Sequence, residues 1–398
     1  MKNLILVGIV CCSYVELAIG QDYVNLSAFV KEDITTLFKA YATPSVDATA
    51  LSLARNWATT ASTKKSFHFD VKFQLATISL APSDQVFNLN QLNLTTLKPV
   101  DANRAIAPGL IGNPNQQSPY LGIWSQARDI TFVVANGQTI TEHIPASVYP
   151  NTTFKLPRAK SLGFNGLLTV PLLQVNMGLI KNMELSFRYG QQIGLSYLTY
   201  HTYGMALKYN LNQLFFREYE EDSLLDFSLL LGYNHFDLTA KLNTFSSNDP
   251  ILLEDIATQK LQLNSQIFNT EFLMSKNLLF LNAFLGTGYA FANSTIALLG
   301  NYPINFLSVS SEVTEALSRN FNTSVHSNTY IFKDPIALNS NTREFYTTIG
   351  LQIKYLWILN TSFSYTYGTS YQGFNVGIGL TVDKLVEQYQ MERDALRF

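Results

Sequence analysis

The chain has few cysteines and few charged residues, and each shortage excludes some kinds of site or surface. Its two cysteines, Cys11 and Cys12, lie in an apolar run near the N-terminus. If that run is removed as a leader, no disulfide, thiolate metal site or cysteine nucleophile remains. Charged residues make up 14% of the chain, against roughly 25% in a typical soluble domain. A lipid-facing surface would explain this deficit.

Long apolar runs are also missing after the leader. No later segment offers 18 or more consecutive apolar residues, so the sequence predicts no transmembrane helix. Residues 1–20 read as a signal peptide, because Lys2 precedes an apolar stretch that ends in small residues at 18–20. The formal charge of −2 shows no excess of Lys and Arg of the kind that nucleic-acid-binding proteins carry. Neither a G-x-S-x-G elbow nor a P-loop occurs.

What the chain does have is alternation, which is clearest in residues 343–382. Three stretches there place large apolar side chains on one face and small or polar side chains on the other. The apolar faces contain Phe345, Ile349, Leu351, Tyr355, Phe363, Tyr365, Tyr367, Phe374, Ile378 and Leu380. In an outer-membrane barrel the apolar face meets lipid and the other face lines the lumen. We therefore expect three barrel strands here.

Further strands are expected along most of the chain, at 66–80, 129–134, 167–176, 183–193, 203–211, 225–242, 260–274 and 278–293. The alternation slips phase at His235 and Phe236, which predicts a bulge. Connections are tight near 179, 276 and 357 but long at 243–257 and 294–341. Short turns at one end and long loops at the other are typical of outer-membrane barrels.

These patterns predict an antiparallel transmembrane β-barrel of about 10–14 strands spanning residues 63–382. A soluble ligand-binding β-protein is the alternative fold. A charged, helix-prone tail follows at 383–398, and a helical segment precedes the barrel at 21–62. Pro44 is expected to end the first helix, and Asp47 to cap a second one through Leu53 and Trp57. The segment is either a plug inside the barrel or a periplasmic tether.

Several phrases together resemble an uncharacterised family of Bacteroidota outer-membrane barrels. They are GLIKNMELSFRY at 178–189, YGMALK at 203–208, MSKNL at 274–278 with LGTGY at 285–289, GLQIKY at 350–355, and the closing run 373–380. The resemblance covers about residues 22–382, and the tail departs from it. That family is distantly similar to outer-membrane long-chain fatty-acid transporters, which carry an N-terminal segment inside the barrel. The resemblance implies a bacterial outer-membrane location and carries over no functional residue.

The candidate lumen-lining residues are Glu184, Arg188, Asp226, Gln352 and Lys354, because each falls on the polar face of its strand. They either tune the selectivity of a pore or form ion pairs in a closed interior.

Catalysis and metal binding have weak support. His235 shares a strand face with Asp237, and His68 with Asp70, but two such pairs arise easily by chance in a long chain. The five histidines are scattered, with no pair at helical ligand spacing. We expect no enzyme activity, no metal and no cofactor.

The first functional hypothesis is passive passage of a small solute, hydrophobic solutes included. The alternative is a non-transporting structural or surface-interaction barrel. The partners expected are outer-membrane lipid, the barrel-assembly machinery and a small solute, but no nucleic acid.

Overall fold

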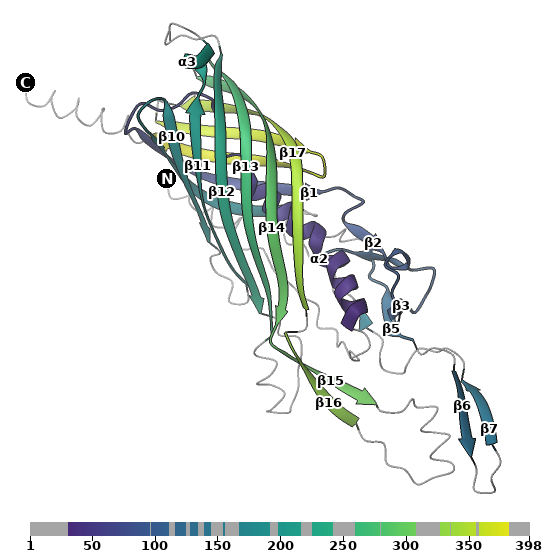
Figure 1. The fold of residues 1–398 in the computed structure, drawn as a ribbon. Coiled ribbons are helices and arrows are strands. Elements are labelled where there is room, and N and C mark those ends of the chain that lie inside the picture. The colour runs from purple at the N-terminus through teal and green to yellow at the C-terminus, as the bar shows by residue number, and fades with distance from the viewer. Residues whose placement is uncertain are drawn as a thin grey trace, which may run out of the picture.

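A computed structural model describes residues 31–381, except 96, 111–115, 125–127, 134–138, 145–153, 156–166, 192–197, 216–224, 242–258, 279, 308–326, 335 and 356–357. Within this part, ten strands close into a barrel in the order β1–β19–β18–β17–β14–β13–β12–β11–β10–β9 (Figure 1). Their bounds are β1 Phe69–Leu80, β9 Leu167–Gly178, β10 Met183–Gln191, β11 Leu198–Asn210, β12 Asp226–Lys241, β13 Lys260–Leu278, β14 Leu281–Leu299, β17 Ile336–Tyr355, β18 Leu359–Gly368 and β19 Tyr371–Thr381.

Every neighbouring pair in the barrel is antiparallel, and β1 closes it by pairing with both β9 and β19. This confirms the expected fold and places the strand number at the lower end of the predicted range. Closure satisfies the backbone groups that an open sheet edge would leave unpaired. Among the described helices, none has the length and apolar run needed to cross a bilayer.

The two ends of the barrel differ in their connections. At one end, called the turn end, the connections are 179–182, 279–280, 356–358 and 211–225, the last including helix α3 (Asn212–Phe215). At the other, called the loop end, they are 81–166, 192–197, 242–259 and 300–335, besides a tight turn at 369–370. The connection expected at 294–341 is shorter at both ends, because β14 runs on to Leu299 and β17 begins at Ile336.

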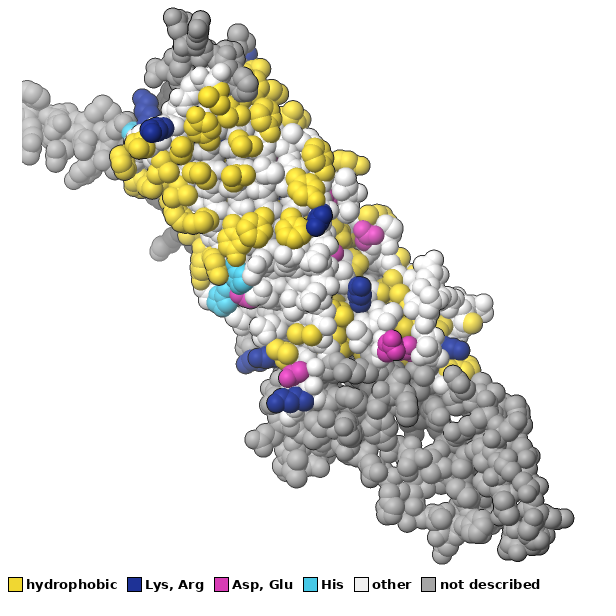
Figure 2. Space-filling view, viewed as in Figure 1, with side chains coloured by type: hydrophobic (Ala, Val, Ile, Leu, Met, Phe, Trp, Pro, Cys, Tyr) yellow, Lys and Arg dark blue, Asp and Glu magenta, His cyan; other side chains and the backbone are white. Residues whose placement is uncertain are grey.

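The outer surface of the barrel has two zones (Figure 2). Large apolar side chains project outward from the part nearer the turn end, which we call the band zone; Phe187, Leu231 and Ile349 are examples. Toward the loop end the outward positions become polar, as at His235, Asp237 and Asn264, and we call this part the extension zone. An apolar outer surface in one zone alone is what a bilayer-spanning barrel requires.

The bulge expected at His235 and Phe236 is absent, so that prediction is wrong. β12 pairs with β11 and β13 in unbroken register through both residues. The pattern shifts because the apolar face changes sides: Phe236 points inward and is 2% exposed, whereas His235 lies on the outer face. The sequence therefore marks the boundary between the two zones.

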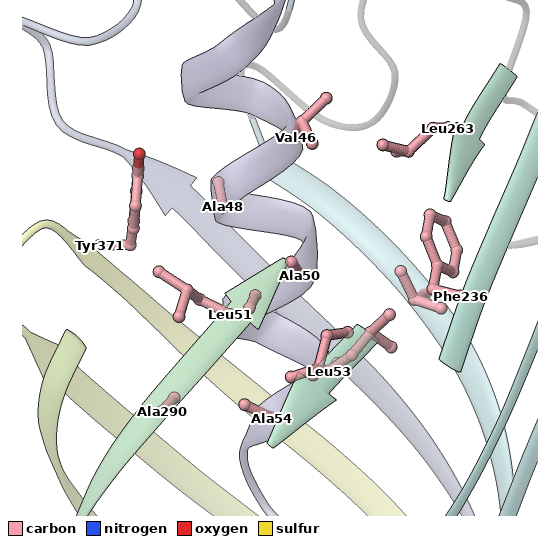
Figure 3. Close-up of a cluster of buried hydrophobic side chains, with 14 of the residues drawn as sticks. Val46, Ala48, Ala50, Leu51, Leu53, Ala54, Phe236, Leu263, Ala290 and Tyr371 are labelled. Atoms are coloured by element: carbon pink, nitrogen blue, oxygen red, sulfur yellow. The ribbon is translucent and has the colours of Figure 1, made fainter. Parts of the chain in front are cut away.

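Helix α2 (Lys31–Ala54) explains why the barrel interior becomes apolar in the extension zone. Val46, Leu51 and Leu53 are buried, and they belong to one hydrophobic cluster with Phe236 and Leu263 of the wall (Figure 3). The cluster also contains Ile267, Ala290, Ala292, Ile296 and Tyr346 from the strands. The helical segment is thus inside the barrel, which decides between plug and tether.

Pro44 does not end the helix, contrary to expectation. α2 continues through it as one helix, and Asp47 caps nothing but accepts a hydrogen bond from the Ser340 hydroxyl at 2.8 Å. A proline inside a helix is unfavourable by about 3 kcal/mol. Burial of Tyr41 and Val46 on either side of Pro44 offsets this loss.

Short strands outside the barrel cover the first half of α2. They are β2 Val86–Asn88, β3 Leu97–Pro99, β4 Ile106–Pro108, β5 Tyr120–Ile123 and β8 Phe154–Lys155, with a 3-10 turn at Leu89–Gln91. Leu37 of the helix packs against Leu89, Leu97 and Leu121. The buried Asp33 carboxylate accepts a hydrogen bond from the Leu97 backbone N–H at 2.8 Å. We call this group the cap sheets; it is held by the helix.

Two further hairpins lie toward the loop end: β6 Arg128–Val133 with β7 Thr139–Ile144, and β15 Asn301–Leu307 with β16 Ser327–Lys333 (Figure 1). The signal peptide expected at 1–20 and the charged tail expected at 383–398 lie outside the described residues.

Candidate functional site

Residues 55–65 form a plug segment that runs from the end of α2 to the start of β1. It passes through the lumen of the band zone, where Trp57 is 1% and Ala61 0% exposed. Trp57, Ala58 and Ala61 pack against Ala206, Leu230 and Leu273 of the wall. The rest of the contact is polar, as the inward faces of the strands predict. The candidate site is therefore a lumen and its resident segment.

Arg188 of β10 is the main clasp on this segment. Its Nη1 donates to the backbone carbonyls of Leu53 at 3.0 Å and Arg55 at 3.2 Å, and its Nη2 to that of Asn56 at 2.9 Å. Gln174 Oε1 accepts from Nε at 3.1 Å and from Nη2 at 2.9 Å. The guanidinium also lies 3.9 Å above the Trp57 ring. These carbonyls are ones that the C-terminal end of α2 leaves without helical partners.

Lys208 and Glu184 hold the segment nearer the turn end. Lys208 Nζ lies 3.1 Å from Glu184 Oε1 and donates to the carbonyls of Thr60 at 3.1 Å and Ser62 at 2.8 Å. Glu184 Oε2 accepts from the Lys64 backbone N–H at 3.2 Å. The ion pair joins two neighbouring strands, since Glu184 of β10 faces Lys208 of β11 in register.

One ion pair and one hydrogen bond from a lysine use β1 itself. Lys64 Nζ lies 2.8 Å from Asp70 Oδ2, and the Asn176 amide donates to Asp70 Oδ1 at 2.6 Å. Lys72 Nζ donates to the Thr59 hydroxyl at 2.8 Å. The segment is thus bound back to the strand that follows it.

Arg55 pairs with Glu344 of β17, and both side chains are almost fully buried. Glu344 Oε1 also accepts from the backbone N–H groups of Ser370 at 3.0 Å and Tyr371 at 2.9 Å, in the β18–β19 turn. Glu271 of β13 is buried nearby, 3.4 Å from the Tyr346 hydroxyl that donates to it. This cluster joins the plug segment to the side of the barrel opposite β10.

The remaining sequence candidates lie nearer the turn end. Asp226 accepts hydrogen bonds from the Ser62 hydroxyl and from the Asn212 amide, the latter at 2.9 Å. Gln352 is buried and donates to Asn360 Oδ1 at 2.9 Å. Lys354 is exposed instead of lining the closed lumen, and its Nζ lies 3.4 Å from Asn277 Oδ1. The structure therefore brings Glu184, Arg188 and Asp226 to the plug segment and leaves Lys354 at the rim.

Two inward glycines allow the segment to pass close to the wall. A Cβ at Gly178 would lie 2.1 Å from the Lys65 carbonyl oxygen, and one at Gly232 would lie 2.8 Å from Trp57 Nε1 and 2.3 Å from Asn269 Oδ1. Real Cβ atoms do not approach other atoms so closely. Gly178 faces backbone atoms and therefore admits only glycine while the segment is in place, whereas at Gly232 the Asn269 and Trp57 side chains would have to shift to admit a methyl group.

Charges around the plug segment balance. Five cations (Arg55, Lys64, Lys72, Arg188, Lys208) face five anions (Asp70, Glu184, Asp226, Glu271, Glu344). The sequence reasoning missed Lys72, Lys208, Glu271 and Glu344 as lumen residues, although each falls on the inward face of its strand. The same alternation rule, applied to every strand, would have found them. Three of these cations form ion pairs, Arg55 with Glu344, Lys64 with Asp70 and Lys208 with Glu184. Removing one partner of such a buried pair is strongly destabilising, because the other charge is left uncompensated.

The histidine–aspartate pairs lie elsewhere. His235 Nε2 is 2.6 Å from Asp237 Oδ2 on the outer face of the extension zone, and Asn264 holds the other Asp237 oxygen at 2.5 Å. Asp70 points inward to Lys64 and Asn176. In the described ranges, no group of three or more His, Cys, Asp or Glu could hold a metal ion.

Comparison with known families identifies the chain. The model of a Family of unknown function (DUF6588) matches residues 1–382. The chain belongs to this family. No curated protein matches it.

Solved structures similar to this family member are outer-membrane barrels. The translocator domain of autotransporter NalP from Neisseria meningitidis is 9% identical with a TM-score of 0.31, covering 86% of this chain and 99% of its own. The outer membrane protease OmpT from Escherichia coli is 8% identical with a TM-score of 0.31, covering 80% and 99%. The transport unit of the autotransporter AIDA-I from Escherichia coli is 9% identical with a TM-score of 0.26, covering 85% and 97%.

The arrangement in this family member restricts what its lumen can do. The segment occupies the lumen at the level of the apolar band, and α2 fills the extension zone above it. Side chains of the wall form hydrogen bonds to the segment, at Gln174, Arg188, Lys208, Ser275 and Asn282. Chemically, the interior is a network of hydrogen bonds and ion pairs, in which a few buried polar atoms, Trp57 Nε1 and Asn269 Oδ1 among them, have no partner among the described residues.

Proposed function

We propose that this protein is a sealed outer-membrane barrel that anchors an interaction surface at its loop end. The observation that carries the proposal is the clasp of Arg188 on the backbone carbonyls of Leu53, Arg55 and Asn56, where α2 meets the plug segment. A lumen closed in this way leaves the loop end, with the cap sheets and two hairpins, as the part that meets other molecules. Outer-membrane lipid surrounds the apolar band.

The energetics favour a permanently closed lumen. Undocking α2 would expose Val46, Leu51 and Leu53, a loss of about 4–9 kcal/mol at roughly 1.5–3 kcal/mol for each side chain. Unpairing the buried Arg55–Glu344 contact adds several kcal/mol. Even a shift from roughly 1:99 to 99:1 in favour of an open state requires a ligand that binds that state about 5.5 kcal/mol more tightly, and the losses above are larger. A small solute that binds weakly cannot supply this.

Passage of a small solute is the second candidate, and one observation favours it. Residues 55–65 are held mainly by polar groups, whereas α2 above them is held by an apolar core. The lower part can therefore rearrange without exposing much apolar surface. Passage of a hydrophobic solute, which the resemblance to long-chain fatty-acid transporters implies, would require such a rearrangement.

A conductance measurement separates the two. Purified protein is inserted into planar lipid bilayers beside a variant that lacks residues 31–62, which serves as the open reference. We expect the full protein to be silent and the deletion variant to conduct. Sustained conductance by the full protein would refute the sealed barrel. Solute-specific swelling of liposomes by the full protein, without ion conductance, would favour the second candidate.

The orientation has its own test. Single cysteines replace Lys98 on the cap sheets and Gln213 in α3, both exposed, and intact cells are treated with a maleimide that cannot cross membranes. The unsubstituted protein reports any labelling of Cys11 or Cys12. We expect Lys98→Cys to be labelled on intact cells and Gln213→Cys only after lysis. The reverse result would place the loop end inside and end the proposal of a surface role.

A further inference from the structure

The cap sheets contain a cavity of about 570 Å³, within the range of about 300–1,000 Å³ typical of small-molecule sites. It lies between the strand β3 region and the start of β5, away from the plug segment. Its walls include Asp101, Asn103, Arg104, Gln117, Ser118 and Tyr120. Neither the plugged lumen nor the apolar band uses these residues.

A buried hydroxyl group at the cavity wall, that of Ser118, lacks a hydrogen-bond partner. This residue is 4% exposed and lines the cavity, and its hydroxyl has no hydrogen-bond partner among the described residues. Buried hydroxyls are normally satisfied by protein, water or a ligand. The hydroxyl oxygen is shielded from the cavity in this rotamer, so the Ser118 side chain has to turn toward the cavity before a polar group of a ligand can satisfy it.

The cavity carries no net charge. Its one cation and one anion pair with each other, with Arg104 Nε 3.4 Å from Asp101 Oδ2. The Asp101 Oδ1 atom also accepts from the Asn103 backbone N–H at 3.0 Å, which fixes the loop. No net field remains to select a charged ligand. The cavity is therefore unsuited to a phosphate or a polycation.

The other walls combine amides with exposed apolar faces. Asn103, Gln116 and Gln117 provide side-chain donors and acceptors, and Gln116 Nε2 is oriented by the Ile106 carbonyl at 3.2 Å. Tyr120 is 55% exposed and Ile106 49% exposed. An aromatic side chain offers a flat apolar face with a polar tip. This mixture suits a molecule that carries hydroxyls around its edge and C–H groups on its face.

We propose that this cavity binds a neutral saccharide. A sugar ring would stack its C–H face on Tyr120 and Ile106 and direct hydroxyls to Ser118 and to the amides of Asn103 and Gln117. The inference deepens the proposed surface role and rests on it for the compartment from which the sugar comes, but the binding itself is testable on the isolated protein.

The experiment uses the full protein in a detergent without a sugar headgroup. Binding of glucose, galactose, N-acetylglucosamine, maltose and lactose is measured by saturation-transfer NMR and titration. We expect saturable binding of at least one sugar. Tyr120→Ala should weaken it by about tenfold or more through loss of stacking, and Ser118→Ala by about fivefold through loss of one hydrogen bond. Tyr120→Phe keeps the ring and should retain binding.

Lys98→Ala is the matched control, since Lys98 is exposed on the same sheets but does not line the cavity. Heat-modifiable migration on gels verifies that each variant keeps a folded barrel. Absence of saturable binding for all five sugars would overturn the proposal, and so would binding that neither Tyr120→Ala nor Ser118→Ala weakens. Binding of triglycine in place of sugars would overturn the saccharide class. A conducting lumen or an inward loop end would instead refute the sealed surface barrel and leave this binding result standing.

Discussion

The band zone and the extension zone are made by the same strands but are opposite in polarity. In the band zone the outside is apolar and the inside is polar, filled by the plug segment with its ion pairs. In the extension zone the outside is polar and the inside is apolar, filled by α2. β12 shows both within one strand, with Leu231 outward in the first zone and Phe236 inward in the second.

The difference shows that a barrel interior is not polar by rule. The polarity of the inward side chains matches that of the segment that fills the lumen, and the polarity of the outward side chains matches that of the surrounding solvent or lipid. Where lipid surrounds the wall, polar groups can be placed only inside, and they need partners there. Beyond the lipid, a largely apolar helix can be buried in the same barrel, because water solvates the polar outer face of the wall. Four substitutions test this comparison.

The largest effect is expected from a charge placed in the extension zone interior. Leu51→Asp puts a carboxylate among apolar side chains where Leu51 is 0% exposed. We expect a loss of about 4 kcal/mol or more in the free energy of unfolding in detergent, measured by thermal denaturation. Lys39→Asp, at an exposed position of the same helix, should change little. Equal stability of the two variants would mean that α2 is not docked in solution.

The next effect tests the band zone interior. Arg188→Met removes the clasp, leaves the carbonyls of Arg55 and Asn56 without this donor, and leaves that of Leu53 with Asn234 alone. We expect a loss of about 3–5 kcal/mol, because each buried acceptor left without a donor costs roughly 1–3 kcal/mol. Arg343→Met is the control, because Arg343 lies exposed on the outer face against the Phe291 ring. Equal losses of stability from the two substitutions would show that the buried clasp contributes no more than an exposed arginine.

A third substitution tests the close passage of the plug segment. Gly232→Ala places a methyl 2.8 Å from Trp57 Nε1 and 2.3 Å from Asn269 Oδ1. Relieving this overlap should lower stability by about 1–3 kcal/mol and increase protease cleavage near residues 55–65. At Gly109 the nearest atom is 3.5 Å from a Cβ position, so Gly109→Ala should be tolerated. Unchanged cleavage of the Gly232 variant would show that Trp57 does not lie against β12.

The smallest effect concerns pH in the extension zone. Burial raises the pKa of the Asp47 carboxyl from 3.8 to about 6, and the Ser340 hydrogen bond opposes part of that rise. The folded protein therefore holds this proton more tightly than the unfolded chain. The resulting stability is complete below pH 3.8 and disappears as pH rises through 6.

From pH 5 to pH 8 this carboxyl should remove about 1.4 kcal/mol of stability. Asp47→Asn keeps an acceptor for Ser340 and cannot ionise, so its stability should fall by that much less across the same range. Melting temperatures at the two pH values measure the difference. Parallel pH curves for the two proteins would show that Asp47 is not buried against β17.

The sequence allowed much of the wall to be predicted and little of what fills it. Alternation placed Glu184, Arg188, Asp226 and Gln352 on inward faces, because direction in a strand depends only on odd or even position. It could not supply their partners, since the carbonyls bound by Arg188 lie 132–135 residues away. It also misread Pro44 as a helix end, because the packing that keeps α2 continuous comes from distant strands.

By itself, the sequence determined that alternating strands would form an antiparallel barrel with an apolar band, since a period of two and the spacing of turns are local properties. Only the tertiary structure decided that the helix lies inside, that the polar lumen charges pair with the plug segment, and that the apolar face changes sides at His235. Those outcomes depend on which surfaces are left for burial after the barrel closes. No single strand contains that information.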